Sequence, residues 1–340
     1  MPHKIGIIGC GVAAQALHLP ALTRLSDVTV AAVSDIDPDR ARQAASRFGV
    51  ARAFTDYRDV LADPTITAVG VLTPPATHVE IGTAALEAGK MVLMEKPLAL
   101  TLNGCDRLIE AAGTRRTAVG FNLRYHRQIA AAKRALAGIG TPLVFRSCFS
   151  GTGNLKGNRT DWRGQVGMGG DALIDLGTHH FDLLRWLFQT EFETIEAVRQ
   201  GEHGAVVTAR LHNGVMVSSV FSHGMAGGHT IEIYGERGRI ACAPYQFDGL
   251  RIDYEGAPSG GARAVVSTLM HPLRALPRAL STSSSGGDFA LAYVEEWRAF
   301  LNEGAVPSLR DGRQALAIAL AAAESMEAGA RVSISSAGVL

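Results

Sequence analysis

The stretch KIGIIGCGVAAQALHLPALTRL, residues 4–25, decides the fold of the first third of this chain. It begins with a short apolar run typical of a buried strand, turns through glycines, and continues with the apolar spacing of a helix. β-rich runs then alternate with helical runs as far as residue 113. Strands that alternate with helices in this way predict a parallel sheet covered by helices on both faces.

The turn inside this stretch, GCGVAA at residues 9–14, has the spacing G-x-G-x-x-A. Gly9 permits a tight turn, Gly11 lets the backbone approach a pyrophosphate, and Ala14 allows the helix to pack closely on the strand. The N-terminus of the helix would then face the phosphates. Because the motif follows a predicted strand and opens a predicted helix, it indicates a dinucleotide site. The alternative is a glycine turn that binds no ligand.

Asp35 lies about 20 residues beyond the glycine motif, at the predicted end of the second strand. A carboxylate in that place is expected to bind the adenosine ribose hydroxyls. It would repel a 2′-phosphate, so NAD is favoured over NADP as the cofactor. Arg40 is a conceivable phosphate partner, but it falls in the next predicted helix and is expected to be solvated.

Composition limits the class of protein. The chain has 340 residues, of which 47% are hydrophobic and 19% charged, which fits a globular protein with room for two domains. Its net charge of +1 gives no general attraction for nucleic acid or for a membrane. The four cysteines are far apart and form no CxxC pair, which argues against a zinc module or a disulfide framework.

The N-terminus runs from a short polar lead straight into a strand, and apolar stretches are interrupted well before the roughly 18 residues of a membrane span. We therefore expect a cytoplasmic protein without a membrane segment.

Several further segments are characteristic when taken together. They are TPPATH (73–78), ALEAGKMVLMEKPLALT (85–101), GFNLRYH (120–126), DWR (161–163), GGDALIDLGTHHFD (169–182) and IEIYGERGRI (231–240). In this order they resemble the Gfo/Idh/MocA (glucose–fructose oxidoreductase / inositol dehydrogenase) oxidoreductase family, and the resemblance runs nearly end to end. The Glu-Lys-Pro and D-x-G-x-H elements are more specific than the glycine motif.

The resemblance implies two domains: an NAD-binding Rossmann-like domain at residues 1–122 and a substrate-binding and oligomerisation domain at 123–340. The second would be an α/β domain built on a large, open, mainly antiparallel sheet, and a homodimer or homotetramer is expected. The β-rich runs beyond residue 191 and turn signals such as Asn213-Gly214 support that sheet independently. The last helix, about 311–328, is expected to pack back near the first domain.

Lys96 stands in Glu95-Lys96-Pro97 at the carboxyl end of a predicted parallel strand, where open α/β sheets bind their ligands. In the family pattern a cis bond precedes the proline and directs the ammonium toward the substrate and the nicotinamide ribose. Lys96 would hold the reacting oxygen and lower the pKa of the alcohol. The alternative is a lysine at a strand end that points into solvent.

Asp175 and His179 are four residues apart, so a helix would place both on one face. The resemblance assigns Asp175 to orienting a substrate hydroxyl and His179 to general acid/base catalysis, for which histidine has a suitable pKa. The alternative is that both are structural, with Asp175 paired to an arginine. His180 is rotated by about 100° and is expected to be structural or at the pocket edge, and Asp182 to support the helix. No metal site is expected.

The remaining expected contacts follow from the motif and the resemblance. The expected cofactor contacts are Gly9, Gly11, Val12, Ala13, Ala14, Asp35, Ile36, Thr73, Pro74, His78, Glu95, Lys96 and Asn122. The expected substrate contacts are Arg124, Tyr125, Trp162, Arg163, Asp175 and His179.

Two features stay open at this level. Asp171 replaces the glycine that is usual there in the family, and it either caps the helix, which we favour, or binds a hydroxyl or amine of the substrate. Residues 255–288 are rich in Gly, Ser, Pro and Arg and form either a lid or oligomer arm or a surface loop. Prolines argue against a membrane-binding helix in that segment.

These observations favour an NAD-dependent dehydrogenase or reductase that acts on a secondary alcohol of a cyclic polyol or sugar, such as an inositol, aldose, aminosugar or nucleotide sugar. One alternative is a glycoside hydrolase that retains NAD. Another is a dinucleotide-binding sensor without activity, although Lys96, Asp175 and His179 are all present. The individual substrate is not encoded in any motif of the chain.

Overall fold

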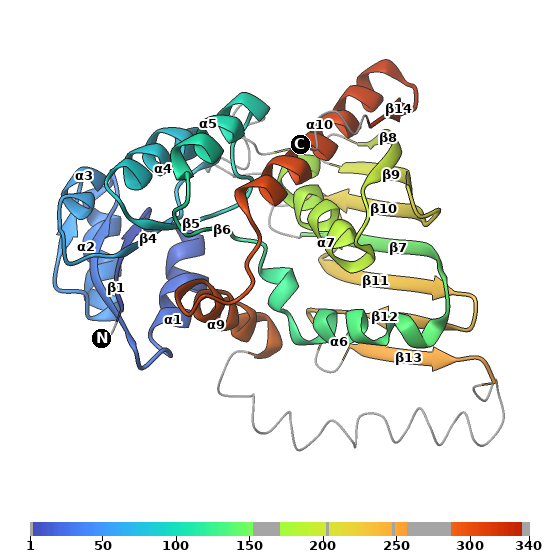
Figure 1. The fold of residues 1–340 in the computed structure, drawn as a ribbon, viewed down its shortest axis with the longest axis horizontal. Helices are drawn as coiled ribbons and strands as arrows, with labels where there is room; N and C mark the ends of the chain where they lie inside the picture. The colour runs from blue at the N-terminus through green and yellow to red at the C-terminus, as the bar shows by residue number, and fades with distance from the viewer. Residues whose placement is uncertain (1–2, 152–170, 202–203, 247–248, 257–286, 335–340) are drawn as a thin grey trace.

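The computed structural model describes residues 3–151, 171–201, 204–246, 249–256 and 287–334. Within these residues the chain forms two sheets that stand side by side (Figure 1). One has six strands in the order β3-β2-β1-β4-β5-β6, and the other has eight in the order β13-β12-β11-β7-β10-β9-β8-β14. This confirms the fold class expected from the sequence.

The six-stranded sheet is parallel throughout. Its strands are β1 (His3–Ile8), β2 (Val28–Ser34), β3 (Ala53–Phe54), β4 (Ala68–Val71), β5 (Met91–Met94) and β6 (Thr117–Val119). Its helices are η1 (Ala14–His18), α1 (Leu19–Leu22), α2 (Pro38–Phe48), α3 (Tyr57–Leu61), η2 (Pro75–Thr77), α4 (His78–Glu87) and α5 (Leu102–Ala112). All four residues of β4 are buried, as expected for a strand covered on both faces. The helix that follows the glycine turn is π-helical over η1 before it continues as α1.

The connection to the second sheet runs through η3 (Asn122–Tyr125), α6 (Arg127–Ala135) and η4 (Leu136–Ile139). Its strands are β7 (Pro142–Ser150), β8 (Phe192–Gln200), β9 (Gly204–Leu211), β10 (Met216–Ser222), β11 (Gly228–Gly235), β12 (Gly238–Cys242), β13 (Leu250–Tyr254) and β14 (Val332–Ser333). The pairing of β7 with β10 is parallel and the other pairings are antiparallel. The predicted turn between β9 and β10 is present, with Gly214 at φ +89°.

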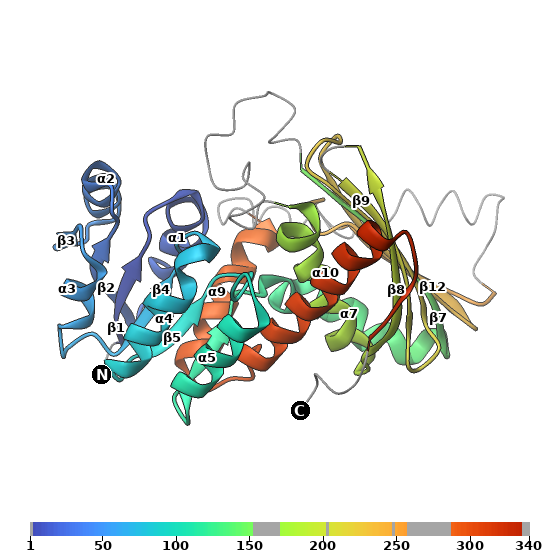
Figure 2. The ribbon, with the colours of Figure 1, turned by 90° about the horizontal axis from the view of Figure 1, so that it is seen from above.

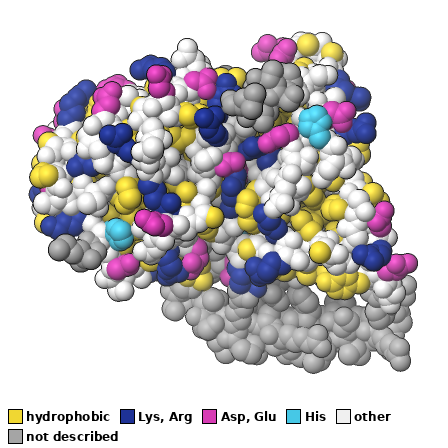
Figure 3. Space-filling view, in the orientation of Figure 1, with side chains coloured by type: hydrophobic (Ala, Val, Ile, Leu, Met, Phe, Trp, Pro, Cys, Tyr) yellow, Lys and Arg dark blue, Asp and Glu magenta, His cyan; other side chains and the backbone are white. Residues whose placement is uncertain are grey.

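One face of the second sheet is covered by η8 (Leu173–Gly177), α7 (Thr178–Phe188) and α10 (Leu309–Ala328), as Figure 2 shows. No helix of the described residues lies over the other face. On the side of the molecule seen in Figure 3, basic and acidic side chains are interspersed, in keeping with a net charge of +1.

Two helices near the C-terminus join the first half of the molecule, built on the six-stranded sheet, to the second half, built on the eight-stranded sheet. Helix α9 (Gly287–Leu301) packs with Trp297 and Phe300 in the same apolar core as Ile5 and Leu19 of the first half. Helix α10 contributes Leu316 to the other core of the parallel sheet, and Ile318, Ala319 and Ala322 to the core of the second sheet. The domain boundary expected at residue 122 stays a prediction, and α9, which lies beyond it in the sequence, packs in the core of the first half.

We predict that Trp297→Ala lowers the free energy of unfolding by about 3–5 kcal/mol, the usual effect of removing a buried tryptophan. The Trp297 side chain is fully buried, and its Nε1–H donates a hydrogen bond to His18 Nδ1 at 3.1 Å. Urea unfolding followed by far-ultraviolet circular dichroism measures the change. Arg298→Ala, at a half-exposed neighbouring position, is the control and should change the value by about 0.5 kcal/mol or less. Equal effects of the two substitutions would contradict this view of α9.

Candidate functional site

A cavity of about 1010 Å³ opens at the carboxyl ends of β1, β2, β4 and β5. This is the edge at which open parallel sheets bind their ligands. The expected cofactor residues that line it are Gly9, Gly11, Val12, Ala13, Asp35, Ile36, Thr73, Pro74, Glu95 and Lys96. The sequence motif and the geometry therefore point to the same place.

The two glycines of the motif have different surroundings. Gly9 adopts φ +95°, and a Cβ there would lie 2.8 Å from the backbone of Leu72. A Cβ on Gly11 would meet nothing within 4 Å, because the backbone faces the open cavity. Gly9 is thus required by the turn itself, whereas Gly11 keeps space free for a ligand.

Asp35 is held at the cavity wall by backbone donors. Its Oδ2 accepts a hydrogen bond from Cys10 N–H at 2.8 Å, and its Oδ1 accepts one from Asp37 N–H at 2.9 Å. Arg40 reaches the same wall, 4.0 Å from Asp35 Oδ1, but its main partner is Asp37 at 2.9 Å. The Arg40 side chain is 53% exposed, so it is solvated only in part, whereas the sequence led us to expect a solvated arginine.

Two large apolar side chains stand open beside this carboxylate. Val12 is 71% exposed and Ile36 is 90% exposed, and both line the cavity. Exposed apolar surface at a cavity edge is available to the flat apolar face of a ligand.

Three expected cofactor residues lie outside the cavity lining. Ala14 is fully buried in the packing of η1. His78 ties two strand-end loops together, because its Nδ1 lies 2.9 Å from Pro97 O and its Nε2 lies 2.8 Å from Thr73 O. Asn122 is buried, and its Nδ2 has no hydrogen-bond partner among the described residues.

Lys96 and Asp175 meet across the boundary between the two sheets. Lys96 follows β5 closely, and its Nζ donates to Asp175 Oδ1 at 2.5 Å and to the Asp175 carbonyl oxygen at 2.8 Å. The side chains are only 12% and 7% exposed. The Lys96–Pro97 bond is cis, as the family pattern implied. Lys96 thus reaches a buried carboxylate, and the expected alternative of a solvent-facing lysine is wrong.

The carboxylate of Asp175 has a second neighbour that the sequence did not indicate. His223 Nε2 lies 3.4 Å from Asp175 Oδ2, and both side chains are buried. Lys96 and His223 are described partners of Asp175, and the alternative in which Asp175 pairs with an arginine stays a prediction.

His179 lies one turn beyond Asp175, where the helix changes from the π-helical turn η8 to α7. Its ring packs against Phe121 and Phe149, with centroids 6.2 Å away in each case. Burial, reinforced by the charge of Lys96, lowers the pKa of His179 to about 3. The imidazole is therefore neutral near pH 7 and can accept a proton.

Glu95 fixes the turn that carries Lys96. Its Oε2 accepts a hydrogen bond from Lys96 N–H at 2.9 Å, and its Oε1 lies 2.8 Å from His18 Nε2. Because His18 Nδ1 accepts from Trp297, the ring proton of neutral His18 is on Nε2 and is donated to Glu95. Burial raises the pKa of Glu95, but the His18 hydrogen bond and the nearby Lys96 charge outweigh it and lower the pKa to about 2.

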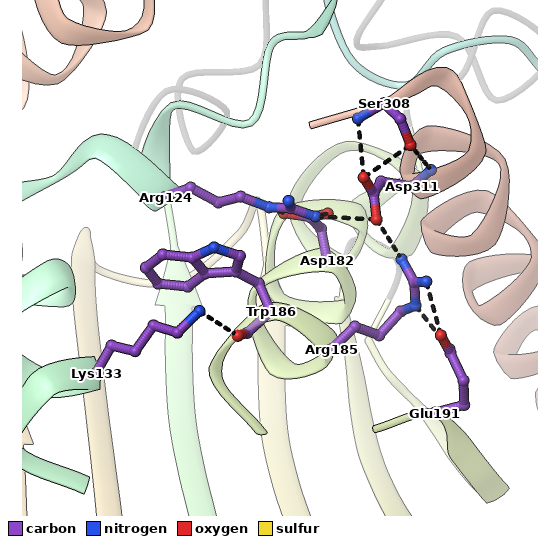
Figure 4. Close-up of polar contacts among 8 residues, drawn as sticks. All are labelled: Arg124, Lys133, Asp182, Arg185, Trp186, Glu191, Ser308 and Asp311. Atoms are coloured by element: carbon purple, nitrogen blue, oxygen red, sulfur yellow. Dashed lines mark hydrogen bonds and ion pairs between the residues drawn. The ribbon is translucent and has the colours of Figure 1, made fainter. Parts of the chain in front are cut away.

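Arg124, which was expected to contact the substrate, forms an ion pair with Asp182 in this structure. Its guanidinium donates to both carboxylate oxygens of Asp182, at 2.8 and 2.5 Å, and lies 3.2 Å from Asp311 (Figure 4). Arg185 joins Asp311 to Glu191 in the same network. These contacts connect η3, α7 and the start of α10, so they indicate a structural role for Arg124.

The other expected positions either have hydrogen-bond partners within the protein or lie outside the residues that the structure describes. The Tyr125 hydroxyl donates to Ala305 O at 3.2 Å. Asp171 Oδ1 accepts from Leu173 N–H at 2.8 Å, which agrees with the helix cap that we favoured. Trp162, Arg163 and most of 255–288 lie outside the described residues.

His180 is buried and structural in character. Its Nδ1 lies 2.9 Å from Ser147 Oγ, and its Nε2 lies 2.8 Å from His229 Nε2. In the described part of the chain no group of three His, Cys, Asp or Glu has the arrangement of a metal site, and no helix is long and apolar enough to cross a membrane.

Two residues near the site were missed at the sequence level, His223 and Tyr245. His223 follows the last residue of β10 and continues the inward alternation of Ser219 and Phe221, which was a usable signal. Tyr245 is half-buried, and this partial burial, together with the charge of Asp175, raises its pKa to about 12. It has no periodic signal, because it lies in the turn after β12.

Comparisons with known proteins agree with this geometry. Residues 3–123 match the model of an oxidoreductase family with an NAD-binding Rossmann fold, and residues 129–241 match the GFO/IDH/MocA C-terminal domain. The inositol 2-dehydrogenase of Acidothermus cellulolyticus is 33% identical, covering 97% of this chain and 94% of the relative. That of Burkholderia ambifaria is 36% identical over 58% of each chain.

Solved structures show the same fold. Levoglucosan dehydrogenase in complex with NADH and levoglucosan has a TM-score of 0.80 at 24% identity, covering 98% of this chain and all of that one. A probable dehydrogenase from Thermotoga maritima has a TM-score of 0.76 at 26% identity, covering 97% and 98%.

We predict that Gly11→Ala leaves the thermal midpoint of unfolding within about 2 °C of wild type, because its Cβ meets no protein atom. The same Cβ faces the cavity, so the Kd for NAD should rise at least about tenfold, or about 1.4 kcal/mol. Isothermal titration calorimetry and a thermal scan measure the two effects. Gly9→Ala is the matched variant and should lose stability, because φ +95° and the Leu72 backbone oppose a side chain. Unchanged NAD affinity in Gly11→Ala would show that the dinucleotide does not pass this turn.

Proposed function

Because the chain belongs to the Gfo/Idh/MocA family of NAD-dependent oxidoreductases acting on CH–OH groups, we propose that its substrate is a cyclic polyol or a sugar with a secondary alcohol. The observation that supports this most is the contact of Lys96 with Asp175, one turn from His179, at the edge of the dinucleotide cavity. A cation, a carboxylate and a neutral imidazole suit a hydroxyl group that loses a proton and a hydride. The inositol dehydrogenases and the levoglucosan dehydrogenase named above act on molecules of this kind.

The residues of the cavity fit NAD. The open backbone at Gly11 and the start of the following helix would hold the pyrophosphate, and Asp35 the adenosine ribose. Asn122 lies outside the cavity lining, but its Nδ2 is buried and unpartnered in the described chain, and we keep it as the proposed donor to the nicotinamide. When bound, NAD supplies the hydride acceptor for oxidation.

NAD is favoured over NADP by the charge at the ribose position. The Asp35 carboxylate would lie close to a 2′-phosphate, and two backbone donors hold it in place. Arg40 could offset that repulsion only by leaving Asp37, its partner at 2.9 Å. The proposed preference for NAD over NADP therefore rests on the carboxylate of Asp35.

The proposed proton transfer uses His179 and Lys96. Neutral His179 accepts the hydroxyl proton, but a pKa of about 3 makes it a weak base. The Lys96 ammonium stabilises the developing negative oxygen and lowers the pKa of the alcohol. This brings the pKa of the alcohol closer to that of His179. Asp175 keeps the ammonium in place through its Oδ1 and its carbonyl oxygen. In the direction of reduction, a protonated His179 would be a strong acid toward the carbonyl oxygen.

The open face of the eight-stranded sheet supports a homo-oligomer. It exposes Val198 (63%), Met216 (49%) and Val206 (36%), and no described helix covers it. Burying such side chains against a second copy would remove apolar surface from water. We include a homodimer or homotetramer in the proposal on this ground.

We predict that wild-type protein reduces NAD in the presence of at least one member of a panel of inositols and pyranoses. His179→Asn should lower kcat by about 10²–10⁴-fold, the range for loss of a general acid/base, with the Kd for NAD within about threefold of wild type. NADH absorbance and calorimetry measure these quantities. His212→Asn, at an exposed position away from the cavity, is the control. Cleavage of a glycoside without net NADH, or no turnover of any polyol, would contradict the proposal.

The pH profile gives a separate prediction. The pKa of His179 is lowered from 6.5 to about 3, so its basic form predominates throughout pH 5–8. For oxidation, kcat/KM should therefore show no acid limb with a midpoint near 6.5, since this ratio reports groups of the free enzyme. A tenfold fall per pH unit below about 6.5, with the folded state intact by circular dichroism, would show that His179 titrates normally and is not the desolvated base described above.

A further inference from the structure

We propose that His223 is a positioning residue of this site: it orients the Asp175 carboxylate, and Asp175 in turn holds the Lys96 ammonium. This rests on the proposed function for its catalytic consequence, but the contact itself can be tested without turnover.

The contact comes from two elements that are distant in sequence. His223 directly follows β10, on the same inward side as Ser219 and Phe221, and Asp175 lies in η8 above that end of the sheet. His223 Nε2 and Asp175 Oδ2 are 3.4 Å apart, and the two side chains are 6% and 7% exposed. At that burial the nearest polar atoms have a large effect on the orientation of a carboxylate, because water screens them little.

The two oxygens of Asp175 have different neighbours. Lys96 Nζ is 2.5 Å from Oδ1, while His223 Nε2 faces Oδ2. A carboxylate contacted on both oxygens by groups from separate elements has little freedom to rotate. Loss of the His223 contact would let it turn and carry the Lys96 ammonium away from the reacting oxygen. At 3.4 Å this contact is not a hydrogen bond in the structure, and His223 Nε2 forms no hydrogen bond to another described residue. Contacts of this kind often shorten and align when substrate binds.

The described residues leave Nδ1 of His179 buried without a hydrogen-bond partner, and its ring packs against Phe121 and Phe149. Among these residues the ring is thus contacted by packing, whereas the Lys96–Asp175 pair has polar contacts that include His223. A substitution at His223 should accordingly act through Asp175 and leave the His179 ring in place.

The contact has a spectroscopic signature. To donate toward Asp175 Oδ2, neutral His223 must carry its proton on Nε2. ¹⁵N spectra of histidine-labelled wild-type protein should show this tautomer for His223, assigned by its absence in His223→Gln. In Asp175→Asn the His223 ring signals should shift clearly, and those of exposed His212 should not. A wild-type His223 with its proton on Nδ1, or ring signals that Asp175→Asn leaves unchanged, would overturn the proposal.

Steady-state kinetics tests the consequence. We expect His223→Leu to lower kcat about 10–100-fold, the effect of a catalytic group displaced by about 1 Å, with the Kd for NAD within about threefold. His223→Gln keeps an N–H donor near the position of Nε2, so it should restore kcat to within about fivefold of wild type. Equal loss in the Leu and Gln variants, both folded by circular dichroism, would overturn the positioning role. If wild type oxidises no polyol, the proposed function fails, and the ¹⁵N measurement still decides the His223 contact.

Discussion

The buried contact between the Lys96 ammonium and the Asp175 carboxylate is the interaction on which this site depends. Each charge lies at the end of a different structural unit, Lys96 after β5 of the parallel sheet and Asp175 in the π-helical turn before α7. Their side chains are 12% and 7% exposed, so neither would be stable there as a charge without the other. The pair therefore defines where the two halves meet and places a cation beside the dinucleotide cavity.

A contact of this kind requires that the halves be fixed relative to each other, and the C-terminal helices provide that. Helix α9 places Trp297 in the core of the first half, where it donates to His18, and His18 donates to Glu95 next to Lys96. Helix α10 packs in the cores of both sheets. The Arg124–Asp182–Asp311 network connects the same helix to α7, which follows Asp175. Packing far from the cavity thus determines distances within it.

Much of the fold could be predicted because its signals are local. The glycine turn and the alternation of strands and helices indicated the parallel sheet, and strand-end position pointed to Lys96. The pairing of Lys96 with Asp175 depends on tertiary structure, and only the family resemblance indicated that these residues act together. The contact of His223 with Asp175 could not be assigned, since the two residues lie 48 positions apart, with α7 and the strands β8, β9 and β10 between them, and no sequence pattern joins them. The partner of Arg124 is of the same kind: the resemblance suggested a substrate contact, which stays a prediction, and the ion pair with Asp182 has no local sequence signal.

A double-mutant cycle on the free energy of unfolding tests the central interaction most directly. The substitutions are Lys96→Met, Asp175→Asn and the two together, and each single change leaves a buried polar or charged partner behind. If the pair joins the two halves as described, the double variant will be less destabilised than the sum of the singles by at least about 1 kcal/mol. Additivity within about 0.3–0.5 kcal/mol would show that Lys96 and Asp175 do not interact energetically, and would contradict this account of the site.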